Sequence, residues 1–140
     1  MDLKNIESIH NGPFKFVYVS SGGGSTAISD FLKVPGASNT ILESYIPYSK
    51  KSMDLFLNRK PDHYCSLSTC LSMAANAYKK CMQIDSSYET KYLIGVSVTA
   101  SLATTYSKIG DHKFYIVVQT ESYTKSIECI LKKGYRTREL

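Results

Sequence analysis

Long hydrophobic runs are missing from this sequence. No stretch of its 140 residues approaches the roughly 18 consecutive apolar residues that a membrane-spanning helix needs. The first residues also lack the charged, apolar and small-residue pattern of a secretion signal. We therefore expect no membrane partner and a cytoplasmic location. The length fits a single domain over residues 1–140.

Cysteine pairs of the kind that bind metals are also missing. None of the four cysteines forms a C-x-x-C motif, and the three histidines do not lie near them at metal-site spacing. Cys70 and Cys81 fall on the apolar face of an expected helix, which is typical of buried free thiols. We expect no metal and no cofactor.

A concentrated basic patch is the third absence. The chain has 17 basic and 12 acidic residues and a net charge of +5, but its lysines are spread out apart from short pairs. Without a basic block that is interleaved with aromatic residues, we expect no nucleic-acid partner. The mild positive balance fits either a small phosphorylated ligand or simply a well-solvated surface.

What the sequence does contain is a strand that leads into a glycine-rich loop and then a helix. Phe14 to Val19 is rich in aromatic and β-branched residues and predicts a strand. Ser20 to Gly24 forms the loop, and Ser25 is the expected N-cap of a helix that Pro35-Gly36 ends. Unpaired N–H groups at a helix start favour negative charge, so the loop suits a phosphate, a carboxylate or an oxyanion. The sequence is not a P-loop, and a tight turn without a ligand explains the glycines equally well.

The remaining pattern predicts a three-layer α/β/α domain with a mixed, mostly parallel sheet and a late antiparallel hairpin. Because ligands bind at the carboxyl ends of strands, we expect the glycine loop, the turn at Ser38 and the loop after Val98 on one rim of the sheet. The further expected elements are a helix capped by Asp2, a strand from Thr40 to Ile46, a helix capped by Ser49, a long helix capped by Ser66, and strands at Tyr92 to Val98, Lys113 to Thr120 and Thr124 to Leu131.

Three short motifs, taken together, resemble the carboxy-terminal domain family of CinA. Val19 to Gly24 stands where that family has Glu-Ser-Cys-Thr-Gly-Gly, and Val34-Pro35-Gly36-Ala37-Ser38 is similar to its Val-Pro-Gly-Ser-Ser turn. The family's Tyr-Ser dipeptide follows ten residues later, as Tyr48-Ser49 does here. The similarity runs from about Val17 to the end of the chain. Bacterial members of the family include nicotinamide mononucleotide deamidases.

A longer similarity points to a eukaryotic branch of that family. The stretch from Val34 to Ser49 resembles domains of plants and protists that precede a nucleotidylyltransferase-like domain. Residues 136–140 read as the first turn of a helix that does not continue. The resemblance therefore implies a segment cut from a longer polypeptide, with an attached nucleotidylyltransferase domain.

The resemblance also implies roles for individual residues. Ser38 takes the position of the proposed nucleophile and Tyr48 that of its tyrosine partner. A lysine five residues further on is replaced by Met53, which leaves Lys50 and Lys51 as candidates for its role, since a serine hydroxyl needs a base. The loop that begins at Thr99 lacks the family's glycines. The expected ligand-binding residues are Ser20, Ser21, Gly22, Gly23, Gly24, Ser25, Thr99 and Ser101.

The resemblance, together with the departures from the family's motifs, implies two alternative functions. The first is hydrolysis of the carboxamide of nicotinamide mononucleotide to nicotinic acid mononucleotide and ammonia. The second is a catalytically degenerate nucleotide-binding or oligomerisation domain that serves an attached nucleotidylyltransferase. Residue type alone leaves Ser38 as either a nucleophile or a turn residue, and Tyr48 as either a catalytic or a packing residue. In both cases we expect a homodimer or a higher homo-oligomer and a small phosphorylated nucleotide as ligand.

Overall fold

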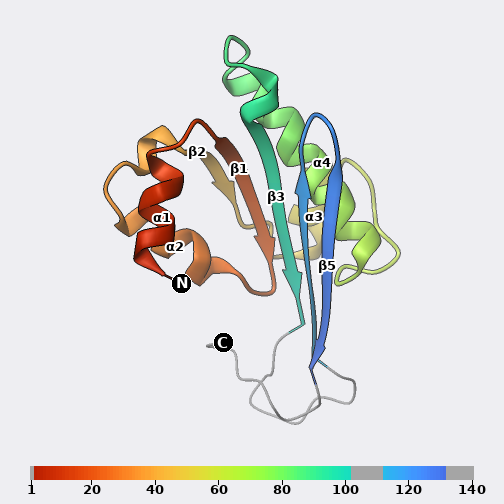
Figure 1. Cartoon of the computed structure of the whole chain (residues 1–140). Coiled ribbons are helices and arrows are strands. Elements are labelled where there is room, and N and C mark those ends of the chain that lie inside the picture. Colours follow the sequence, from red (N-terminus) through yellow and green to blue (C-terminus); the bar gives the residue numbers. More distant parts are fainter. Residues whose placement is uncertain (1, 102–111, 132–140) are drawn as a thin grey trace.

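A five-stranded mixed sheet organises the part of the chain that the computed structural model describes, residues 2–101 and 112–131 (Figure 1). Short 3-10 turns occur at Ala37–Asn39 and Thr90–Tyr92. The helices and strands are α1 (Leu3–His10), β1 (Lys15–Ser21), α2 (Ser25–Lys33), β2 (Ile41–Tyr45), α3 (Lys50–Leu57), α4 (Leu67–Ile84), β3 (Leu93–Ala100), β4 (His112–Gln119) and β5 (Thr124–Leu131).

The strand order in the sheet is β2-β1-β3-β4-β5. β1 pairs in parallel with both β2 and β3, whereas β4 is antiparallel to β3 and β5 is antiparallel to β4. Every strand except β4 therefore runs in the same direction. This arrangement confirms the expected α/β class, the mixed sheet and the late hairpin. β2 lies at the sheet edge and ends before Pro47, a residue that cannot donate a ladder hydrogen bond.

Helices cover both faces of the sheet (Figure 1). On one face, Val17 and Val19 of β1 pack with Met53 of α3 and Met73 of α4, and all four side chains are buried. On the other face, Phe16 and Tyr18 pack against Ile28 and Phe31 of α2. Burial of these two sets on opposite faces of one strand follows from the two-residue period of a β-strand.

Side-chain caps fix the starts of three helices as the sequence predicts. Asp2, Ser49 and Ser66 each accept a hydrogen bond from a backbone N–H in the first turn of α1, α3 and α4. The predicted cap of α2 is wrong, because Ser25 is already helical and Gly24 is the N-cap. Gly24 has a φ of 90°, and a Cβ atom there would lie 2.7 Å from the Tyr18 hydroxyl. Only glycine fits this left-handed, crowded position.

The expectation that the glycine loop, the turn at Ser38 and the loop after Val98 share one rim is wrong for the Ser38 turn. Because β1 and β2 are parallel, the turn that precedes β2 lies beside the start of β1, and the Phe16 N–H donates to the Thr40 carbonyl at 2.8 Å. The glycine loop instead follows the end of β1. A helix that joins two parallel strands returns the chain to the amino edge of the sheet. Ser38 therefore lies at the amino edge and the glycine loop at the carboxyl edge.

The sequence predicts no membrane-spanning helix. Among the described residues, no helix is both long enough and apolar enough to span a membrane. The predicted helix start at 136–140 and residues 102–111 of the predicted loop that begins at Thr99 lie outside the described residues.

Candidate functional site

The carboxyl edge of the sheet gathers the predicted ligand-binding residues. Ser21 at the end of β1 pairs in register with Thr99 of β3, and the N–H of Ser101 donates to the Lys113 carbonyl at 2.8 Å. The last residue of β2, Tyr45, pairs with Val19, which places the end of β2 beside the same loop. The glycine loop and the end of β3 therefore form one continuous edge, as predicted.

The glycine loop packs closely against β3. Gly22 has a φ of 77°, and a Cβ atom there would lie 2.0 Å from the carbonyl oxygen of Ala100. Together with Gly24, this contact shows that the loop needs glycine for its own backbone path. The glycines are thus explained structurally, and a ligand role for the loop must rest on other groups. One such group is Ser20, whose side chain is 1% exposed and whose Oγ has no hydrogen-bond partner among the described residues.

Tyr64 links two predicted site residues at the carboxyl edge. Its carbonyl accepts a hydrogen bond from Thr99 Oγ1 at 3.3 Å, and the Lys50 ammonium lies 5.7 Å from the centre of its ring. Its hydroxyl donates to Asp54 at 2.8 Å, and this hydrogen bond raises the pKa of Tyr64 above its ordinary value. Lys50 is therefore close to the predicted ligand-binding edge.

The amino edge holds a separate cavity that includes Ser38. Its volume is about 450 Å³, and Ser38 is an exposed residue at its border. This volume lies in the range of small-molecule sites, about 300–1,000 Å³. The residues around the cavity are His10, Asn11, Gly12, Lys15, Ser38, Asn39 and Tyr88.

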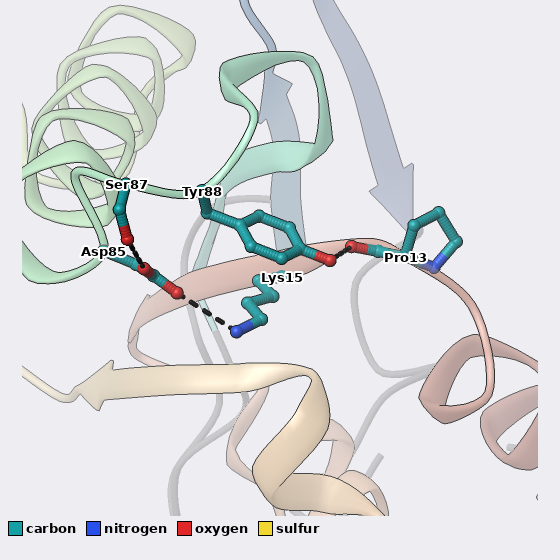
Figure 2. A network of polar contacts seen from close by, with 5 residues as sticks. All are labelled: Pro13, Lys15, Asp85, Ser87 and Tyr88. Atoms are coloured by element: carbon teal, nitrogen blue, oxygen red, sulfur yellow. Dashed lines mark hydrogen bonds and ion pairs between the residues drawn. The ribbon is translucent and has the colours of Figure 1, made fainter.

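Lys15 is the centre of a polar network beside this cavity (Figure 2). Its ammonium lies 3.0 Å from Asp85 and 4.3 Å from the centre of the Tyr88 ring. The Tyr88 hydroxyl donates to the Pro13 carbonyl at 2.6 Å, and Ser87 Oγ donates to Asp85 at 3.5 Å. The network ties the segment before β1 to the connection between α4 and β3, so that Lys15 is held in place.

The buried side chain of His10 supports the turn that carries Ser38. Its side chain is 2% exposed, its Nδ1 lies 2.8 Å from Thr40 Oγ1, and its Nε2 lies 2.9 Å from the Phe31 carbonyl. Since a carbonyl can only accept, Nε2 carries the proton and donates. Both ring nitrogens are engaged, and His10 therefore positions the turn between α2 and β2.

The structure does not bring Ser38 and Tyr48 together within one chain. Ser38 precedes β2 and Tyr48 follows it, and the five residues of β2 alone span about 17 Å at about 3.3 Å each. Tyr48 is 61% exposed, and Lys50 and Lys51 are also exposed at the start of α3. Met53, at the position of the family's lysine, is 1% exposed in the core and offers no acid–base chemistry.

Four residues around the Ser38 cavity escaped the sequence analysis. They are His10, Lys15 and Tyr88, which line the cavity, and Asp85, which pairs with Lys15 beside it; no local motif links them. The one usable signal is a lysine within an otherwise apolar and aromatic strand. Among the described residues, no group of three or more metal-ligating side chains is found.

Comparison of the sequence finds no matching protein family and no matching curated protein. Comparison of the structure finds clear matches. The competence/damage-inducible protein CihA from Agrobacterium tumefaciens superposes with a TM-score of 0.72 and 12% identity, over 97% of this chain and 81% of that chain. The chain has a CinA-like fold.

Two further structures extend this likeness. A CinA superfamily protein from Enterobacter cloacae gives a TM-score of 0.66 at 13% identity, over 93% of this chain and 77% of that chain. The competence damage-inducible protein A (ComA) from Klebsiella pneumoniae gives 0.69 at 9% identity, over 98% and 83%. At such identities the CinA-like fold is shared, while function has to be argued from the site itself.

Proposed function

We propose that this chain is a nicotinamide-nucleotide amidase that hydrolyses the carboxamide of nicotinamide mononucleotide. The observation that carries the proposal is the position of Ser38, an exposed hydroxyl at the border of a cavity of about 450 Å³ that also contains a cation and an aromatic ring. Lys15 suits an anionic group of the substrate, and Tyr88 offers an aromatic surface. The CinA-like fold and the motif around Ser38 support the same assignment.

The reaction needs a nucleophile and a proton acceptor. Ser38 Oγ would attack the carboxamide carbon while a base takes the hydroxyl proton. The tetrahedral intermediate would then expel ammonia, which leaves with that proton as the C–N bond breaks. Water would hydrolyse the resulting acyl ester, release nicotinic acid mononucleotide and restore the Ser38 hydroxyl.

Within residues 2–101 and 112–131 of a single chain, none of the side chains around the Ser38 cavity supplies the base. His10 has both ring nitrogens engaged, and the Lys15 ammonium is paired with Asp85. Tyr48, Lys50 and Lys51 lie at the other end of β2 and are exposed. We therefore extend the proposal to a homo-oligomer in which Tyr48 and a lysine of one copy meet Ser38 of another.

The first experiment measures ammonia release from nicotinamide mononucleotide. We expect turnover by the wild-type protein and a loss of at least about a hundredfold in Ser38→Ala, because the nucleophile is removed. Ser8→Ala, an exposed serine on α1, is the matched control and should retain full activity. Equal activity of Ser38→Ala and Ser8→Ala would contradict the assignment of Ser38.

A mixing experiment tests the shared site. Ser38→Ala and Tyr48→Phe should each be inactive alone. In a dimer with shared sites, mixing them should restore roughly a quarter of wild-type activity, since half of the dimers are mixed and one of their two sites is intact. Activity that stays absent after subunit exchange would exclude a site built from two copies.

The second candidate function is a nucleotide-binding or assembly domain without turnover. Burial of Met53 at the position of the family's lysine favours it, because a methionine in the core supplies no proton transfer. This candidate predicts that nicotinamide mononucleotide raises the unfolding temperature without any release of ammonia. Release that depends on Ser38 would exclude it.

A further inference from the structure

We propose that the edge strand β5 is a dimerisation surface, on which a second copy of this chain pairs antiparallel so that Ile127 lies opposite the partner's Ile127. The contact would join two five-stranded sheets into one continuous sheet about a two-fold axis. It does not depend on the proposed amidase activity. It is also separate from the contact that a shared Ser38 site requires, because Ser38 and Tyr48 flank β2 at the opposite edge of the sheet.

The two edges of the sheet differ in how well they are protected against pairing with another chain. β2 is five residues long, its pairing with β1 shifts register between Phe16 and Val17, and Pro47 follows it closely. Short length, irregular register and proline are common ways in which proteins block an edge. β5 has eight residues, pairs with β4 at every one of them without a register shift, and contains neither proline nor glycine. Its backbone is therefore free of the features that block β2.

Side chains on both faces of β5 are exposed. Residues 124–128 and 130 are exposed, and the apolar side chains of Ile127 and Ile130 are each 52% exposed. β5 borders the sheet on the side away from β2, and among the described strands it pairs with β4 alone (Figure 1). Exposed β-branched side chains on a long, regular edge strand favour pairing with a further strand.

Strand geometry restricts how two copies of β5 can pair. Residues directly opposite each other in an antiparallel pair lie on the same face, and successive residues of a strand alternate between faces. A two-fold axis perpendicular to the sheet therefore places one residue opposite its own copy. Near the middle of Thr124–Leu131 that residue is either Ile127 or Glu128. Glu128 would bring two carboxylates together, whereas Ile127 forms a favourable apolar pair, so Ile127 lies on the axis.

This register also suits the charged residues of the strand. Lys125 lies opposite the partner's Cys129, and Glu128 lies opposite the partner's Ser126. Like charges therefore do not oppose each other between the paired strands, and such opposition is what destabilises many edge contacts. A second copy of this chain is the occupant that the pattern fits, because the same sequence supplies a compatible residue at each position.

The register continues an apolar row of the existing sheet. Val98 of β3 pairs with Ile116 of β4, and Ile116 pairs with Ile127 of β5. Paired residues of neighbouring antiparallel strands share a face, so these three side chains form one row that ends at the open edge. Across the axis the row would run on into the same three residues of the partner. The dimer would thereby cover part of the exposed surface of Ile127.

Sedimentation at protein concentrations from about 1 µM to about 500 µM tests the assembly, since a contact of one strand pair is small and reversible. We expect a dimer at high concentration, or a tetramer where the shared-site contact also forms. Ile127→Lys should halve the mass of the particle, because two lysines would face each other on the axis. Leu55→Lys adds the same charge at a residue of α3 that is 82% exposed, and it should leave the mass unchanged.

Two results of this experiment would overturn the proposal. A particle whose mass is the same in the wild type and in Ile127→Lys would assemble through another surface. A wild-type protein that stays monomeric over the whole concentration range would leave the edge to a strand of a different protein.

Disulfide cross-linking tests the register. Opposed Cα atoms of an antiparallel pair are about 4.5–5.5 Å apart, which a disulfide can span. In a background with Cys65→Ser and Cys129→Ser, the remaining native thiols, Cys70 and Cys81, are buried. With oxidised glutathione, we expect Ile127→Cys to form a linked dimer at least about tenfold faster than Ser126→Cys, whose two copies lie out of register.

A mixture of Ser126→Cys and Glu128→Cys proteins is the matched pair, because these two positions oppose each other across the axis. We expect the mixture to give a linked heterodimer faster than either protein links with itself. Leu55→Cys measures the rate of random collision between exposed thiols. Equal rates for Ile127→Cys and Leu55→Cys, or faster linking of Ser126→Cys than of Ile127→Cys, would overturn the proposed pairing.

Discussion

The side chain of Lys15 joins two segments that lie far apart in the sequence. Its ammonium contacts the Asp85 carboxylate and the face of the Tyr88 ring, and both residues follow α4. Asp85 is the C-cap of that helix, where the dipole disfavours a negative charge. The positive charge of Lys15 therefore offsets both the negative charge of Asp85 and the negative end of the α4 dipole.

This arrangement predicts an asymmetric response to substitution. Lys15→Met removes the cation beside the Asp85 carboxylate at the negative end of α4 and should cost about 1–2 kcal/mol of stability. Asp85→Asn leaves a lysine near that same end, where a cation is favourable, and should cost less than about 1 kcal/mol. Urea unfolding of both variants measures the difference. A larger loss in Asp85→Asn would contradict this view of the pair.

At the scale of elements, α4 lies so close to β3 that one residue of the strand has no room for a side chain. A Cβ atom on Gly95 would lie 2.4 Å from the Ala74 carbonyl oxygen and 2.5 Å from the Tyr78 nitrogen. Both are backbone atoms of the helix, so relief requires movement of the whole helix. Gly95 thus sets the distance between α4 and the sheet.

We expect Gly95→Ala to destabilise the protein by about 3 kcal/mol or more, because overpacking against backbone cannot be relieved by a rotamer change. Gly12→Ala is the matched control, since a Cβ atom there would be 3.4 Å from the Ile9 carbonyl oxygen and its stability should change by less than about 1 kcal/mol. Equal unfolding free energies for the two variants would show that α4 can shift.

The elements were predictable from the sequence to the extent that their signals are local. The Asp2, Ser49 and Ser66 caps and the final hairpin follow from neighbouring residues, and all are confirmed. The position of Ser38 was not predictable, because the direction in which β2 runs decides at which edge of the sheet Ser38 lies. The ion pair of Lys15 with Asp85 depends on tertiary packing, and nothing in either local sequence indicates it.

At the scale of the whole molecule, the core holds two buried thiols as expected. Burial raises the pKa of Cys70 to about 11 and that of Cys81 to about 11, and it raises the pKa of Tyr18 to about 12. The unfolded chain would ionise these cysteines near pH 8.5, well before the folded chain does. Below that pH both cysteines are protonated in the folded and the unfolded chain, and their contribution to the free energy of unfolding is fully present.

We expect the free energy of unfolding to fall as the pH rises from about 8.5 toward 11, because only the unfolded chain then gains thiolates. Urea midpoints at pH 7.5, 9 and 10.5 measure this decrease. Cys81→Ala should show a shallower decrease than the wild type across the same range. An unchanged slope in that variant would mean that Cys81 does not contribute.

The place of β1 in the sheet has a consequence for how the chain folds during synthesis. β1 is the first strand to be made, yet one of its two edges pairs with β3, which follows about 80 residues later. At about 5–20 residues per second, a ribosome needs several seconds to a quarter of a minute to deliver that partner. Throughout this interval β1, a hydrophobic inner strand of the finished sheet, offers one open edge to any other nascent chain. Rapid pairing of β3 with that edge, once α4 has packed on the face of β1, therefore favours a high yield of folded protein.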